Sequence, residues 1–429
     1  MISEQEVSIP AVPLDREVFG HIEGSLRPLL ANDAWPLRFA VTRSDSQSFH
    51  CEIGTLALSE LAAGRRPASI FEFLPRRARR EDRFVTVFLV PTGIGAEIGG
   101  HSGDATPAAQ LLAAASDVLI THPNVLNAAD INEMSPDMLY VEGSVISRLM
   151  MGGIGLVPVR ANRVLAVIGP HEDQVFVESA INICNAARVS AGIDVVKAVL
   201  LREPLEMISS YSVGGRAVGS IEGFGALCAA IDAQLGSFDA LAISSRVEVS
   251  RDLHDRYFHD LAVVNPYGGV EAMLTHAVSS LYDLPSAHAP MYEDWETWDQ
   301  SAGIMDPRVA AEGVSVPFFF SVLKGLRRSP RIVALDPGGQ AQSDALTVAD
   351  VDCLVLPEGC LGLPVMAAVA QGIPVIYVRD RENLARNPVA ELAGPGAAVH
   401  LAENYLEAAG MVSALRGGIS LGRRPMPLA

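Results

Sequence analysis

The sequence has few cysteines, a deficit of positive charge and no long apolar run. Only Cys51, Cys184, Cys228, Cys353 and Cys360 occur in 429 residues. That number and scatter exclude a disulfide framework or a zinc knuckle and favour a reducing compartment. Lys and Arg total 32 against 50 Asp and Glu, so the formal charge is −18. Such a charge repels a nucleic-acid backbone and an anionic membrane surface, so we expect no nucleic-acid partner.

Signals for secretion or membrane insertion are also missing. The N-terminus carries acidic residues where a signal peptide needs a basic start and an apolar run. The most apolar stretch, 146–159, is interrupted by Arg148 and three glycines, and it is shorter than the roughly 20 residues that cross a bilayer. We therefore expect a cytoplasmic protein with no membrane partner. The positive mean hydropathy of +0.26 indicates apolar surface buried between subunits, hence a homo-oligomer.

From Arg83 onward, short β-branched runs, Gly or Pro turns and Ala-rich amphipathic helices alternate. This alternation predicts an α/β fold with mainly parallel, doubly wound (Rossmann-like) sheets. The predicted strands are 84–90, 118–121, 164–168, 195–200, 240–244, 261–264, 332–335, 353–356 and 375–378. The predicted helices are 106–115, 173–189, 220–235, 270–282, 316–327, 364–371 and 402–415.

The first 80 residues follow a different pattern. A helix is predicted near 16–30, and two alternating segments, 37–43 and 48–56, predict a β-hairpin. We therefore divide the chain into an N-terminal α+β appendage (1–82), an α/β domain with the candidate site (83–236), and a second α/β domain or a continuation of the same sheet (237–429). The stretch 286–308 is expected to be a long excursion, typical of a lid or a subunit contact.

The segment 91–144 contains most of the candidate site residues. Its glycine-rich turn contains Thr92, Gly93 and Gly95, and the small residues let an anionic ligand approach backbone N–H groups. Ile98 replaces the third glycine of a dinucleotide fingerprint, and no Walker lysine follows. The turn is therefore expected to bind substrate, with neither a nicotinamide nor an ATP motif.

Polar side chains then gather after two successive predicted strands. His101 and Asp104 precede the helix that begins at Thr106. After the next strand come His122, Asn124, Asn127, Asp130 and Glu133. The carboxyl ends of neighbouring parallel strands share one edge of a sheet, so these side chains are expected to converge.

This cluster supports two kinds of chemistry. Histidine titrates near neutral pH and a neighbouring carboxylate fixes its tautomer, so His101 and His122, assisted by Asp104 and Asp130, are candidate proton-transfer residues. Alternatively, His101, Asp104 and His122 hold a divalent metal. Taken singly, each residue is equally well a loop, cap or turn former; their concentration at strand ends favours a site.

Further candidates lie at other strand ends. Ser144 follows a third strand, but it lacks the G-x-S-x-G elbow of a hydrolase nucleophile. Arg246 is a candidate partner for a substrate carboxylate. Asn265, Gly268 and Gly269 begin a helix and are candidate anion ligands. On that helix, His276 is expected to be a buried core histidine.

The C-terminal stretch 351–378 contains Gly359–Cys360 and, later, Gly372–Ile373–Pro374–Val375. It loosely resembles the second cysteine motif of aspartate, glutamate and hydantoin racemases, although no first cysteine motif occurs in the other half. The same pattern is similar to the donor half of nucleotide-sugar glycosyltransferases, and an ordinary strand–turn–helix–strand unit remains the alternative.

Three motifs in order, VPTGIGAEIGGHSGDATP, THPNVLNAADINEM and LYVEGSV, resemble a family of bacterial and plastid proteins catalogued as a domain of unknown function. The resemblance spans most of the chain and implies no particular reaction.

Together these observations predict an enzyme that moves a proton on a small anionic metabolite, a carboxylate, in isomerase or lyase chemistry. The alternatives are a metal-dependent hydrolase that uses the same cluster and a non-catalytic ligand-binding protein.

Overall fold

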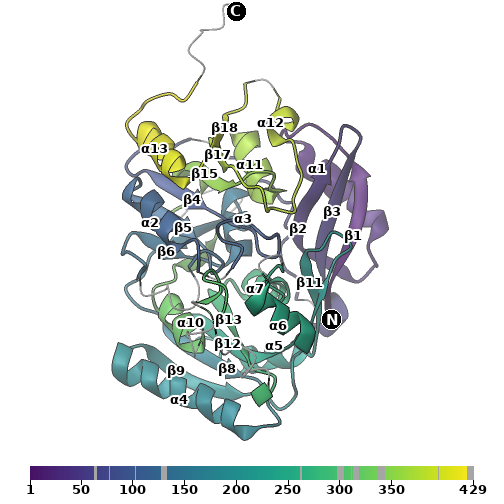
Figure 1. Ribbon diagram of the computed structural model, residues 1–429, viewed down its shortest axis with the longest axis vertical. Coiled ribbons are helices and arrows are strands. Elements are labelled where there is room, and N and C mark those ends of the chain that lie inside the picture. The colour runs from purple at the N-terminus through teal and green to yellow at the C-terminus, as the bar shows by residue number, and fades with distance from the viewer. Residues whose placement is uncertain are drawn as a thin grey trace, which may run out of the picture.

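The computed structural model describes residues 1–61, 65–76, 78–101, 103–126, 133–260, 263–296, 304–310, 312, 318–335, 344–394 and 396–422. Two large sheets dominate the fold. In Figure 1 the six-stranded upper sheet lies at the upper left, and the ten-stranded lower sheet runs from the purple strands on the right to the teal strands at the bottom, with helix α7 (Gly268–Tyr282) between them. Among the described helices, none has the length and apolar character needed to span a bilayer.

The upper sheet has six strands, and every neighbouring pair is parallel. In spatial order they are β18 (Val399–Ala402), β17 (Val375–Val378), β15 (Val351–Pro357), β4 (Val85–Phe88), β5 (Val118–Thr121) and β6 (Met138–Tyr140). The inner strands are continuous apolar runs because both of their faces are buried. The order along the chain reverses between β4 and β15, since the later strands extend to the other side of β4.

Helices cover both faces of this sheet. Alternate residues of β15 belong to two different core clusters, Leu354 to one and Val355 to the other. The first cluster includes residues of α3 (Gly143–Met150) and α11 (Leu363–Gln371); the second includes residues of α2 (Thr106–Ala114) and α13 (Tyr405–Arg416). The period-two alternation of a strand therefore divides the core into two layers.

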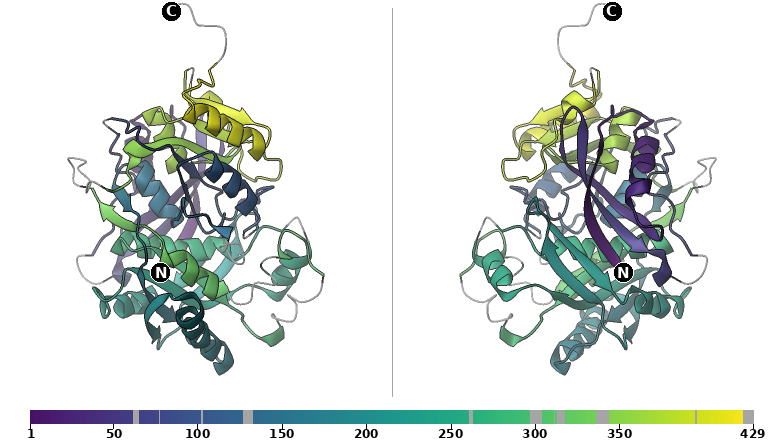
Figure 2. Two further views of the ribbon diagram at one scale, coloured as in Figure 1. Left: turned by 90° about the vertical axis from the view of Figure 1, so that its left-hand side faces the viewer. Right: turned by 90° about the vertical axis from the view of Figure 1, so that its right-hand side faces the viewer.

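The lower sheet has ten strands and is mixed. Its main order is β16 (Leu361–Gly362), β2 (Ala34–Ser44), β3 (Ser48–Ala57), β1 (Ile2–Pro10), β11 (Ala217–Glu222), β10 (Glu206–Tyr211), β12 (Ala240–Glu248), β8 (Arg163–Ile168) and β9 (Asp194–Leu200), with β13 (Ser286–Met291) also paired to β12. Pairing is antiparallel from β16 to β10 and parallel among β8, β9, β12 and β13. Figure 2 (right) shows the purple N-terminal strands on one side of the molecule, running into the teal strands below.

The remaining elements complete the layers. A small antiparallel pair joins β7 (Ile154–Val157) to β14 (Arg331–Ala334). The other helices are α1 (Val18–Leu26), α4 (Gln174–Ala191), α5 (Phe224–Asp232), α6 (Arg251–His259), α10 (Phe318–Arg327) and α12 (Val389–Leu392), with short 3-10 turns at Arg27–Leu29, Leu58–Glu60 and Val348–Asp350. Helix α7 contacts α3 on one side and β2, β11 and β13 on the other, so it connects the two sheets.

The α/β class predicted from the sequence is confirmed, and the parallel pairing holds throughout the upper sheet. The ten-stranded sheet is mixed, because the predicted hairpin (β2 and β3) joins the large sheet through β1. Strands from both sides of residue 236 build the upper sheet. Of the strand predicted at 261–264, the described residues Val263 and Val264 are not in a strand, whereas the predicted excursion at 286–308 begins with β13.

Candidate active site

Two cavities adjoin at the carboxyl ends of β4, β5, β6 and β15. The arginine cavity, about 860 Å³ with its part open to solvent included, is lined by Arg38 and Arg216 together with residues of the β4 and β15 loops. The histidine pocket, about 600 Å³ on the same basis, is lined by residues that follow β5 and β6, by one face of α7 and by β13. Both cavities share Thr92, His122, Gly143, Ala272 and His276. They therefore form one continuous depression.

Strand order explains this position. Loops at the carboxyl ends of two adjacent parallel strands diverge where the strand order reverses, and a crevice opens between them. The reversal falls between β4 and β15. Pro91 and Thr92 follow β4, Cys360 follows β15, and all three line the arginine cavity.

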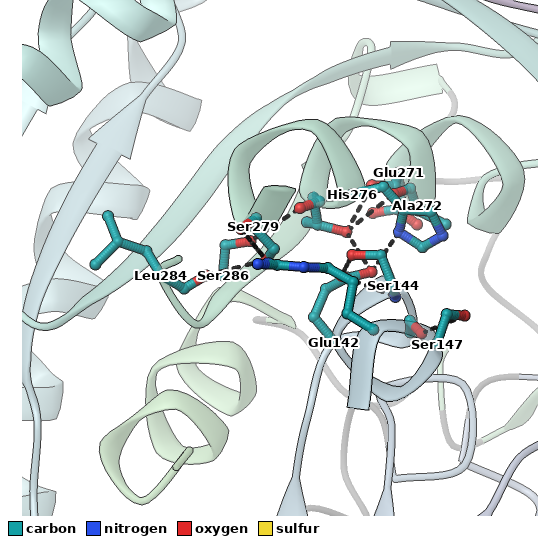
Figure 3. Close-up of polar contacts among 12 residues, drawn as sticks. Glu142, Ser144, Ser147, Glu271, Ala272, His276, Ser279, Leu284 and Ser286 are labelled. Atoms are coloured by element: carbon teal, nitrogen blue, oxygen red, sulfur yellow. Dashed lines mark hydrogen bonds and ion pairs between the residues drawn. The ribbon is translucent and has the colours of Figure 1, made fainter. Parts of the chain in front are cut away.

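The central feature is a pair formed by His276 on α7 and Glu142 at the N-cap of α3 (Figure 3). His276 Nδ1 contacts Glu142 Oε1 as an ion pair, without hydrogen-bond geometry. The other oxygen of Glu142 accepts hydrogen bonds from the backbone N–H of Ser144, at 3.0 Å, and from its hydroxyl. Burial alone raises the pKa of Glu142, but His276 and Ser144 outweigh it and leave the pKa lowered. The carboxylate is thus ionised and fixed against one ring nitrogen.

The second ring nitrogen of His276 is available for chemistry. Its side chain is 12% exposed and lines both cavities. Within the described part of the chain, Nε2 makes no hydrogen bond. When Nδ1 carries its proton toward Glu142, Nε2 holds a lone pair, which is the arrangement of an oriented general base.

His122 also borders both cavities, and its tautomer is defined by the backbone. The N–H of Val90 donates to His122 Nε2 at 3.0 Å, so the neutral ring carries its proton on Nδ1. Burial is the main cause that lowers the pKa of His122 to about 4. The ring is therefore neutral near pH 7, and Nδ1–H has no acceptor among the described residues.

A second His–Glu pair, His288 with Glu271, also lines the histidine pocket. His288 Nδ1 is 2.7 Å from Glu271 Oε1, and His288 Nε2 is 2.9 Å from the hydroxyl oxygen of Ser245. The His288 side chain is 0% exposed. Ser245 itself is buried and also contacts the sulfur of Met207. Both ring nitrogens are therefore occupied, which is typical of a satisfied buried histidine.

Two residues predicted as catalytic lie elsewhere. His101 lines a separate cavity with Gly95, and its ring is 5.6 Å from that of Tyr257. Burial chiefly lowers the pKa of His101 to about 4 and raises that of Asp104 to about 7. Asp104 Oδ1 accepts a hydrogen bond from the N–H of Gly99 at 2.8 Å, so it fixes the loop. Among the described residues, no three His, Cys, Asp or Glu side chains group as metal ligands, so the predicted set of His101, Asp104 and His122 does not come together.

Asn124 and Asn265 line the histidine pocket, yet their side-chain amides form hydrogen bonds with the backbone. Asn124 Nδ2 donates to the carbonyls of Val90 and Gly99, each at 2.9 Å. Asn265 Oδ1 accepts from the N–H groups of Tyr267 and Gly268 at 2.9 and 3.3 Å, and thereby fixes the turn that leads into α7.

The predicted glycines allow close packing of three segments. Gly93 has a φ of +78°, and a Cβ there would lie 2.9 Å from the carbonyl oxygen of Ala217. A Cβ on Gly269 would collide with the same carbonyl, and one on Gly268 would collide with Thr92. These glycines bring the β4 loop, β11 and α7 into contact, so any larger residue would push the cavity walls apart.

The remaining predicted residues are spread out. Ser144 supports Glu142, as described above. Arg246 lines a different surface groove together with Arg202. Glu133 is exposed, and its backbone carbonyl accepts from Gln110 at 3.3 Å. Asn127 and Asp130 lie outside the described residues.

Cys360, the cysteine of the racemase-like stretch, lies on the wall of the arginine cavity. Burial raises the pKa of its thiol to about 12, and Asn383 Nδ2 lies 3.1 Å from its sulfur. The thiol is therefore protonated at neutral pH and is a poor base.

Residue-type reasoning missed the two arginines and placed His276 in the core. Glu142 belongs to the third polar strand end, with the predicted Ser144, but nothing local indicates that a helix far along the chain places His276 against it.

Comparison with known proteins defines the family. Residues 85–423 match the family described as protein of unknown function (DUF3326), and the chain belongs to it. A relative from Synechococcus sp., named an uncharacterized lipoprotein, is 32% identical over 341 residues, which cover 78% of this chain and 91% of the relative. No solved structure matches the chain.

Proposed function

We propose that this protein is an enzyme that moves a proton on carbon in a small anionic metabolite, as an isomerase or a lyase. The observation that carries the proposal is the His276–Glu142 pair, whose outer ring nitrogen borders a cavity shared with His122. We further propose that the six-stranded sheet works as doubly wound sheets do, with ligand held where the strand order reverses.

The chemistry assigns one role to each histidine. His276 Nε2 takes a proton from an acidic C–H of the substrate, and Glu142 stabilises the imidazolium that forms. The electron pair left behind moves onto a neighbouring carbonyl oxygen, where the Nδ1–H of neutral His122 donates a hydrogen bond. Return of the proton to another carbon gives isomerisation, and loss of a β-substituent gives elimination.

The test is solvent deuterium exchange. The protein is incubated in D2O with a panel of small 2-oxo and 2-hydroxy acids, and loss of C–H signals is followed by NMR. We expect exchange with at least one acid, and a fall of roughly 10²- to 10⁴-fold in His276→Gln. If no acid exchanges, or if His276→Gln exchanges at the wild-type rate, the proposal is wrong.

Other expectations from the sequence stay proposals. The metal-dependent hydrolase predicts activity that chelation abolishes and one metal restores. The ligand-binding protein predicts tight binding without turnover. A cytoplasmic location and a homo-oligomer are tested by cell fractionation and by sedimentation; a membrane-bound fraction would favour the anchoring that the name of the Synechococcus relative describes.

A further inference from the structure

Arg216, just before β11, is the least satisfied charged group on the cavity wall. It is 3% exposed and lines the arginine cavity. Its Nε lies 3.1 Å from Glu52 Oε2, but without hydrogen-bond geometry. No other described residue accepts a hydrogen bond from this guanidinium. A guanidinium has five N–H donors, and leaving them unpaired inside a protein is costly.

A second arginine lies on the same wall. Arg38 on β2 pairs with Glu4, and its other terminal nitrogen is 4.0 Å from Glu52. Neither glutamate is among the residues that line the cavity. The two positive charges therefore border the cavity while the two negative charges lie behind them, and the group is neutral overall. Because the four side chains carry no net charge, we expect them to bind an anion with one negative charge more favourably than a dianion.

The arginine cavity is bordered by the two histidines and by the first turn of α7. His122 and His276 border it at the junction with the histidine pocket. Gly269, in the first turn of α7, also lines it, so the positive end of that helix adds to the field of the arginines.

We propose that Arg216, with Arg38 beside it, binds the carboxylate of the substrate and thereby presents the acidic C–H to His276. The substrate class is a small monocarboxylic acid whose acidic C–H lies next to a carbonyl group. This inference rests on the proposed proton transfer for the identity of the site, but its binding step is measured separately. Arg38 lies outside the segment that defines the family, whereas Arg216 lies within it.

Binding of 2-oxobutyrate, 2-hydroxybutyrate, propionate and inorganic phosphate to the full chain, measured by calorimetry at equal ionic strength, tests the inference. The variant is Glu52→Gln/Arg216→Met, which removes the arginine without leaving Glu52 as a lone buried charge. We expect a carboxylate to bind the wild type and to bind this variant at least about tenfold more weakly. Arg216→Lys, which keeps the charge but loses the planar fork, should also weaken binding and serves if the double variant does not fold.

The matched control is Arg148→Met, because Arg148 is half-buried and ion-paired to Asp283 but lines neither cavity. It should bind like the wild type. The inference is overturned if no carboxylate binds, if both Arg216 variants bind as well as the wild type, or if phosphate binds more tightly than every carboxylate. Carboxylate binding that depends on Arg216 but is unaccompanied by deuterium exchange would overturn the proposed proton transfer and leave this inference standing.

Discussion

The two His–Glu pairs along α7 both line the histidine pocket, but their histidines differ in the partner of the second ring nitrogen. The helix supplies the histidine to one pair, His276 with Glu142, and the glutamate to the other, Glu271 with His288. Ser245 occupies the outer nitrogen of His288 at 2.9 Å, whereas the outer nitrogen of His276 has no hydrogen-bond partner in the described chain. Burial and pairing are thus insufficient signs of a catalytic histidine. The partner of the second ring nitrogen distinguishes the two cases.

The largest expected effect comes from neutralising the carboxylate of one pair. Glu142→Gln should slow deuterium exchange roughly 10²- to 10³-fold, because a neutral amide neither fixes the base tautomer nor stabilises the imidazolium. Glu271→Gln is the matched control and should change the rate by less than about threefold. Equal losses in both variants would mean that the comparison misidentifies the catalytic pair.

Removing the enclosed histidine should instead affect stability. His288→Gln leaves Glu271 and Ser245 without their hydrogen-bond partner, so the free energy of unfolding should fall by about 2–3 kcal/mol. His276→Gln should lower the free energy of unfolding less, since His276 Nε2 has no hydrogen bond among the described residues to lose. Urea unfolding of both variants measures the difference, and a larger loss for His276→Gln would contradict it.

The pH dependence of stability follows from the buried histidines. The pKa of His122 is about 4 in the folded chain, below its ordinary value of 6.5, so the unfolded chain binds more protons between these values. The contribution of His122 is therefore complete above about pH 6.5 and is lost as pH falls toward 4. His122→Gln should reduce the difference in unfolding free energy between neutral and acid pH by about 1–2 kcal/mol.

His101, whose folded pKa is also about 4, is the control for this experiment. His101→Gln should also reduce the difference in unfolding free energy between neutral and acid pH. Only His122→Gln should also slow deuterium exchange; slowing in both would return His101 to the site.

The smallest effect is expected at Asp104. Its folded pKa is raised to about 7, so its contribution to stability is complete below its ordinary value of 3.8 and is lost as pH rises through about 7. Asp104→Asn keeps an acceptor for the N–H of Gly99 and should gain about 1 kcal/mol relative to the wild type between pH 6 and pH 8. Exchange should not change. A large loss of rate would restore the catalytic role predicted from the sequence.

Much of the upper sheet could be predicted. The bounds of β5 and β17 equal those predicted, because buried parallel strands are short, continuous apolar runs between turn residues. In the lower sheet, β10 and β11 carry many Ser, Gly and Glu residues and are half-exposed. Their pattern is weak, and only pairing with neighbours makes them strands.

Some residues of the candidate site could also be predicted from the sequence, and others could not. His122 could be predicted because it follows a strand, at the edge where ligands bind. His276 could not, because a histidine within an apolar helix looks the same whether its second nitrogen is enclosed or borders a cavity. Asp104 and Asn265 were predicted as site residues because the residue types that fix loops by hydrogen bonds to the backbone are the same types that bind ligands.

The sequence by itself determined most strands and helices of the upper sheet, and with them the polar loops at the carboxyl ends of β4, β5 and β6. Only the tertiary structure decided which of those side chains meet. Burial of Val270, Met273, Leu274 and Ala277 fixes α7 between the two sheets, and that long-range packing places His276 against Glu142. Local patterns cannot encode such a contact, because its free energy comes from apolar surface contributed by segments far apart in the chain.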